Sequence, residues 1–190
     1  KLLLSKENPW GLILFKRNIE SFRQLKRLII TIRRITKDKY FPIMIDEEGG
    51  TVSRISQLIN HNVYQKLFGD LYKMRPKISI NLYKRYLLEV INFLKALGIN
   101  INTVPVLDVL RKNTNKIIGN RSYSNDKNIV KKLGTICVNV YELNKIGTVI
   151  KHIPGHGCAS ADSHIKIPKV NLSTQDLNGT DFFPFKNNRS

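Results

Sequence analysis

Residues 151–164 form a short segment rich in the side chains that move protons or hold metal ions. It contains three histidines, one cysteine and one aspartate. Zinc is the metal most often held by such side chains. The spacing matches no common zinc pattern, and Pro154 and Gly155 keep His152 and His156 from sharing one helix face as in HExxH. A zinc site is therefore the weaker interpretation, and we predict no metal.

Proton transfer by Asp162 and His164 is the stronger interpretation of this segment. The two residues are two positions apart, so they can pair. A carboxylate bonded to one ring nitrogen fixes the histidine tautomer and leaves the other nitrogen free to carry protons. The pattern predicts an acid/base centre of Asp162 and His164. His156, which lies between two glycines, is expected to fix the loop instead.

Short apolar runs alternate with helical patterns along the chain. The runs typical of buried strands cover residues 11–15, 41–45, 99–104 and 147–150. Apolar residues recur at helical spacing in segments 21–35, 80–97 and 126–144, and Ser173 could cap a further helix. Residues 47–50 are expected to form a charged, flexible loop. Residues 56–79 are the least regular, with short helices or a disordered loop.

Strands separated by helices predict parallel β-α-β units. Both an open doubly wound sheet and a barrel fit this alternation. Polar residues follow the apolar runs directly, at the position where a (β/α)8 barrel builds its site: Asp46, Asp108, Arg121, Lys151 and His152. Such a barrel needs roughly 250 residues. The sequence therefore predicts an α/β fold, an incomplete (β/α)8 TIM-type barrel formed by one partial domain over residues 1–190.

The net charge of +18 suggests a polyanion such as nucleic acid as one possible partner. The charges are spread over the predicted helices, with no tail or aromatic-rich stripe, so compositional drift explains them better. No apolar run reaches the 18 residues of a membrane span. Cys137 and Cys158 form no CxxC pair or disulfide framework, which favours the cytoplasm.

Several ordered motifs resemble those of bacterial β-N-acetylglucosaminidases of glycoside hydrolase family 3, the single-domain kind that acts in peptidoglycan recycling. That family has a Lys-His-Phe-Pro-Gly-His-Gly stretch followed by Asp-Ser-His, and this chain differs by Ile153 in place of Phe. Its Asp-x-Glu-Gly-Gly-x-Val-x-Arg loop corresponds to residues 46–54. Residues 11–18, 105–109 and 119–124 resemble further stretches in the same order, so the similarity covers nearly the whole chain.

The resemblance implies a role for each matching residue. His164 would be the general acid/base, with Asp162 as its partner. The residues implied to bind an N-acetylglucosamine ring are Asp46, Arg54, Arg121, Lys151 and His152. A helix or turn cap remains the alternative for Asp46, and surface ion pairs remain the alternative for the two arginines. Asp108 is interpreted as a loop brace.

Glu47 and Glu48 resemble a carboxylate pair for glycoside cleavage. Adjacent side chains of an extended segment point apart, so neither is assigned a catalytic role. A retaining glycosidase also needs a nucleophile. In the family it is an aspartate on a later strand, and no residue of this chain matches it; Asp176 and Asp181 share only the residue type. The chain is thus expected to be truncated at both ends relative to the family.

The leading hypothesis is a retaining β-N-acetylhexosaminidase that acts on β-linked N-acetylglucosamine in cell-wall (peptidoglycan) fragments. It would need no metal or organic cofactor, would work in the cytoplasm, and would involve no membrane and no specific nucleic acid. A non-catalytic, sugar-binding remnant of such an enzyme is the alternative, favoured by the missing nucleophile. A basic polyanion-binding protein is the third hypothesis, and it rests only on the charge.

Overall fold

The computed structural model describes residues 4, 6–59, 61–159 and 167–186. Within them, a central parallel sheet has the strand order β1–β2–β5–β6. The strands are β1 (Leu12–Leu14), β2 (Ile43–Ile45), β5 (Ile101–Asn102) and β6 (Gly147–Thr148). Each strand pairs with the next one in parallel register, for example Leu14 with Ile45 and Ile45 with Asn102.

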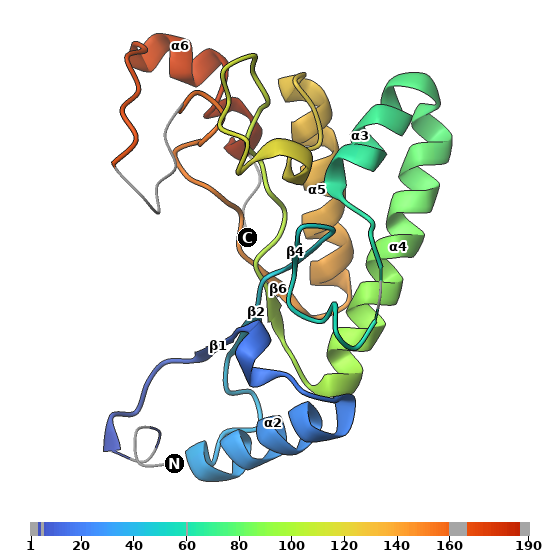
Figure 1. Cartoon of the computed structure of the whole chain (residues 1–190), viewed down its shortest axis with the longest axis vertical. Coiled ribbons are helices and arrows are strands. Elements are labelled where there is room, and N and C mark those ends of the chain that lie inside the picture. The colour runs from blue at the N-terminus through green and yellow to red at the C-terminus, as the bar shows by residue number, and fades with distance from the viewer. Residues whose placement is uncertain (1–3, 5, 60, 160–166, 187–190) are drawn as a thin grey trace.

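Helices connect these strands, as the alternating pattern predicts. The helices of the described residues are α2 (Phe22–Thr36), α3 (Gln65–Met74), α4 (Pro76–Leu97), α5 (Lys127–Leu143) and α6 (Thr174–Gly179). Single 3-10 turns are η1 (Lys16–Asn18), η2 (Gly119–Arg121) and η3 (Phe183–Phe185). In Figure 1, α4 and α5 run along the same side of the short strands, and α2 lies at one end of them.

Side-chain caps fix where the helices begin. The hydroxyl of Ser21 accepts a hydrogen bond from the backbone N–H of Gln24, 3.1 Å away, at the start of α2. Asp126 does the same for Asn128 at 2.8 Å at the start of α5. Each cap satisfies a backbone donor that has no partner inside the helix. Both starts agree with the sequence-based prediction.

The core lies between the strands and the inner faces of the helices. Ile43 and Ile45 of β2 are fully buried, as are Leu25 of α2, Leu94 of α4 and Leu133 of α5. Burying side chains of this size stabilises the folded chain by roughly 1.5–3 kcal/mol each relative to exposure. The apolar runs that predict the strands therefore mark the centre of the domain.

The segment 47–50 is not a flexible loop, and that expectation was wrong. It contains strand β3 (Glu47–Gly49), which pairs antiparallel with β4 (Val52–Ser53) to form a hairpin. Glu47 and Glu48 are 3% and 4% exposed. The Glu48 carboxylate bonds to Arg121 and Lys151, and the backbone of Glu47 bonds to Asn102. Tertiary contacts therefore override the polar character of the segment.

The parallel sheet does not close into a barrel over the described residues, because β1 and β6 each pair on one side only. The domain therefore has the architecture expected from the sequence, an incomplete TIM-type barrel. Segment 56–79 contains helix α3 and the first residues of α4. Among the described helices, none combines the length and the apolar character that crossing a membrane demands.

Candidate functional site

A polar pocket of about 640 Å³ opens at the ends of the parallel strands. Asp46 follows β2 directly, Thr103 follows β5, and Lys151 comes shortly after β6, where it forms a parallel bridge with Val106. The hairpin β3–β4 and turn η2 supply the facing wall. The charged and histidine side chains that line the pocket are Asp46, Glu48, Arg54, Lys116, Arg121, Lys151, His152 and His156.

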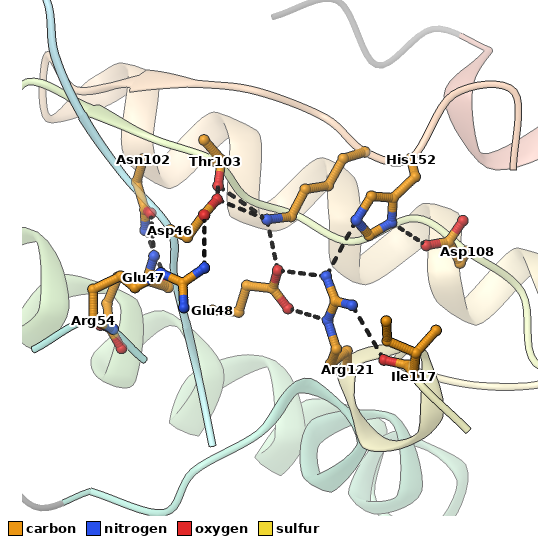
Figure 2. Close-up of polar contacts among 11 residues, drawn as sticks. Asp46, Glu47, Glu48, Arg54, Asn102, Thr103, Asp108, Ile117, Arg121 and His152 are labelled. Carbon is orange, nitrogen blue, oxygen red and sulfur yellow. Dashed lines mark hydrogen bonds and ion pairs between the residues drawn. The ribbon is translucent and has the colours of Figure 1, made fainter. Parts of the chain in front are cut away.

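Asp46 is held by three neighbours on one side of the pocket. Its Oδ2 accepts a hydrogen bond from Arg54 Nη2 at 3.0 Å, and its Oδ1 accepts one from the Thr103 hydroxyl (Figure 2). Lys151 Nζ lies 3.3 Å from Oδ1. Burial alone would raise the pKa of Asp46, but the Thr103 hydrogen bond and the Lys151 charge outweigh it and lower the pKa to about 2. The carboxylate is therefore fully ionised at neutral pH.

Lys151 links the two halves of the network. Its ammonium lies 2.6 Å from Glu48 Oε1, donates to Thr103 Oγ1 at 2.9 Å and contacts Asp46. These contacts occupy the three donors of the ammonium group. The lysine thus holds β2, β3 and β5 together at the floor of the pocket.

Arg121 forms a two-point contact with Glu48. Its Nε and Nη2 donate to the two carboxylate oxygens at 2.8 and 2.9 Å (Figure 2). Burial lowers the pKa of Arg121, but the hydrogen bond and charge of Glu48 raise it above its ordinary value. Paired donors of this kind fix geometry as well as charge.

His152 is fixed in one tautomer by Arg121 and Asp108. Arg121 Nη2 lies 3.1 Å from His152 Nε2, and Asp108 Oδ2 lies 2.6 Å from Nδ1 (Figure 2). A guanidinium only donates, so Nε2 must accept and the proton must be on Nδ1. Both ring nitrogens are therefore occupied, and a sugar hydroxyl could bond His152 only if one of these contacts opened.

The structure gathers the five residues expected to bind sugar, namely Asp46, Arg54, Arg121, Lys151 and His152, around this one pocket. Their positions agree with the sequence-based expectation, whereas their role in binding stays a prediction. The expected acid/base residues, Asp162 and His164, lie outside the described residues. His156 lines the pocket, and its backbone N–H donates to Asp108 Oδ1 at 2.6 Å.

Sequence reasoning missed two members of the network and understated a third. Glu48 was passed over, yet it carries the central carboxylate between Lys151 and Arg121. Thr103 was not singled out, although its place at the end of a predicted strand was a usable signal. Asp108 does brace a loop, through the N–H of His156, but it also orients His152.

In the part of the chain that the structure describes, no three histidine, cysteine or acidic side chains converge on one point as metal ligands would. Most charges of the pocket are paired. Asp46 and Glu48 contact Arg54, Arg121 and Lys151, and Lys116 also lines the pocket. Such a surface offers both donors and acceptors, which suits a hydroxyl-rich ligand.

Comparison with known proteins gives one consistent family. Residues 1–188 match the model of the glycosyl hydrolase family 3 N terminal domain. The beta-hexosaminidase A of Pseudoalteromonas piscicida is 31% identical over 96% of this chain and 31% of its own length. The beta-hexosaminidase of Hydrogenovibrio crunogenus is 31% identical over 92% of this chain and 48% of its own length. The chain thus spans about 31% and 48% of the lengths of these two curated relatives.

Solved structures agree with this assignment. The NagZ protein of Neisseria gonorrhoeae superposes with a TM-score of 0.85 at 28% identity, over 93% of this chain and 51% of that one. A structure of that protein holds N-trifluoroacetyl-D-glucosamine. A fungal multi-domain beta-N-acetylglucosaminidase of the same family superposes with a TM-score of 0.89 at 32% identity, over 97% of this chain and 22% of that one.

Proposed function

This chain belongs to glycosyl hydrolase family 3, and we propose that it forms the part of a retaining β-N-acetylhexosaminidase that binds N-acetylglucosamine. The supporting observation is the charge-balanced network of Asp46, Glu48, Arg121 and Lys151 at the ends of the parallel strands. Residues 1–190 act as one partial barrel domain in this proposal. The substrate is β-linked N-acetylglucosamine in peptidoglycan fragments.

The pocket recognises the sugar ring through its hydroxyl groups. Each hydroxyl can donate to a carboxylate and accept from a cation, and bonds to charged partners are the stronger ones. Asp46 and Glu48 supply acceptors, and Arg54 and Arg121 supply donors. Lys151 donates to a sugar hydroxyl in exchange for one of its contacts with Asp46, Glu48 or Thr103. Their mutual pairing holds them in place before the sugar arrives, which reduces the entropy lost on binding.

Hydrolysis needs proton transfer, which we assign to His164 with Asp162 as its partner. The imidazole protonates the leaving oxygen in the first step and activates water in the second. We assign no residue of this chain as the nucleophile. The proposed setting is the cytoplasm, where the free thiols of Cys137 and Cys158 would stay reduced.

Sugar binding is tested by titrating the chain with N-acetylglucosamine and following it by protein NMR. Lys151→Met should weaken binding by about 10-fold or more, because two pocket carboxylates lose a charged partner. Lys66→Met is the matched control, since Lys66 pairs with Asp70 on the surface of α3. The affinity of the Lys66→Met variant for N-acetylglucosamine should equal that of the parent chain. Absence of saturable binding by the parent chain would contradict the proposal.

The acid/base assignment is tested by a series of aryl β-N-acetylglucosaminides in a protein that also contains the nucleophile. His164→Ala should slow hydrolysis by roughly 10²–10⁴-fold, the usual scale of positioned acid/base catalysis. Good leaving groups need less protonation and should be affected less in the first step. An unchanged dependence on the leaving group would assign His164 to loop bracing instead.

A further inference from the structure

Glu47 lies behind the pocket, with its side chain directed away from that of Glu48. The side chain is fully buried. Its Oε2 accepts three hydrogen bonds, from the Ser53 hydroxyl at 2.9 Å, the Arg54 N–H at 3.0 Å and the Ile55 N–H at 3.1 Å. One carboxylate oxygen thus closes the β3–β4 hairpin and fixes the start of the segment that follows it.

The other oxygen of Glu47 depends on His61. His61 Nε2 lies 3.2 Å from Glu47 Oε1, close enough for an ion pair but not aligned for a good hydrogen bond. Among the described residues, Oε1 has no hydrogen-bond partner. The charged or titratable groups that face His61 are Glu47 from β3 and, from α4, Tyr86 and Glu89.

The backbone of Glu47 is equally constrained. Asn102 of β5 accepts from its N–H and donates to its carbonyl oxygen, each at 2.9 Å. The next turn is tight, because Gly49 has φ +86° and a side chain there would meet the carbonyl oxygen of Val63 at 2.2 Å. The hairpin and the 61–63 segment therefore pack directly against each other.

We propose that His61 is a positioning residue for the sugar pocket, acting through Glu47. A buried carboxylate oxygen without a partner is costly, so losing the imidazole favours movement of Glu47 toward water. Asp46 and Glu48 flank Glu47 in the chain, and Arg54 donates its N–H to it. Movement of Glu47 therefore displaces pocket side chains on both arms of the hairpin. This inference rests on the proposed function for its effect on sugar binding.

Comparing His61→Leu with His61→Gln distinguishes the effect of losing the hydrogen-bond donor from the effect of changing the side-chain volume. Gln can place an N–H near the position of Nε2, whereas Leu fills space without a donor. We expect His61→Leu to weaken N-acetylglucosamine binding by roughly 5- to 10-fold, the scale of leaving a buried carboxylate oxygen without a polar neighbour. His61→Gln should stay within about 2-fold of the parent chain.

A second measurement does not depend on sugar. Hydrogen exchange of the Arg54 and Ile55 amides, both bonded to Glu47, should accelerate in His61→Leu and not in His61→Gln. If the parent chain binds no sugar but this exchange pattern appears, the proposed function fails and the control of the hairpin by His61 stands. Unchanged exchange in His61→Leu, or equal losses in both variants, would overturn the inference. Should His61→Leu not fold, His61→Asn replaces it, because its shorter amide cannot reach Glu47.

Discussion

At the scale of single residues, the pocket is built from charges that neutralise one another. Lys151 lies between Asp46 and Glu48, and Arg121 lies between Glu48 and His152. Removing one member leaves a neighbour partly buried and without its partner, which costs more than the pair itself contributes. Single substitutions here should therefore affect stability and binding together.

The pH dependence of stability should reveal Asp46. Its pKa is about 2 in the folded chain, below its ordinary value. The ionised carboxylate therefore stabilises the fold fully above about pH 4, and this stabilisation is lost as pH falls through the folded pKa. Asp46→Asn lacks this contribution at every pH. The difference in unfolding free energy between the parent chain and the variant should shrink as pH falls from about 5 to about 2. Urea denaturation across that window measures it, and parallel curves would contradict the assignment.

At the scale of elements, the loop that contains His152 is supported by a partly buried ion pair. The side chain of Asp181, between α6 and η3, is fully buried and accepts a hydrogen bond from Arg111. The loop packs directly on it, because a side chain at Gly155 would meet Asp181 Cβ at 2.8 Å. The C-terminal part of the described chain thus helps to fix residues 152–157.

Breaking this pair should destabilise the fold. Asp181→Asn should lower the unfolding free energy by about 2 kcal/mol, less than for a fully buried pair because the Arg111 side chain is 33% exposed. Asp70→Asn, which breaks the exposed Lys66–Asp70 pair on α3, should change it by less than about 0.5 kcal/mol. Chemical denaturation of both variants makes the comparison. Equal effects would mean that Asp181 does not support the loop.

At the scale of the whole molecule, the sequence predicts the parallel sheet well because short apolar runs mark its strands, most clearly β2, whose Ile43 and Ile45 are fully buried. The positions of Asp46 and Lys151 follow, since the ends of parallel strands meet at one edge. The hairpin could not be predicted in this way. Its Glu-Glu-Gly-Gly sequence looks like an exposed loop, and only partners far along the chain, such as Arg121 and Asn102, account for its burial.

The net charge of +18 is a property of the whole molecule. Measuring binding at several salt concentrations distinguishes binding through this surface charge from binding in the pocket. Binding of a DNA duplex through spread surface lysines and arginines should weaken by about 10-fold or more between about 50 and 200 mM salt, because counterions are released. Binding of N-acetylglucosamine should change by less than about 2-fold, since the pocket charges are paired and the sugar is neutral.

Lys151→Met links the two measurements. It should weaken sugar binding and leave DNA affinity within about 2-fold of the parent chain, because one paired lysine contributes little to the surface charge. Fluorescence anisotropy of a labelled duplex, repeated with unrelated sequences, gives the DNA affinities. Tight binding that persists at high salt and distinguishes one DNA sequence from another would favour a nucleic-acid partner over a sugar, because a diffuse surface charge produces neither property.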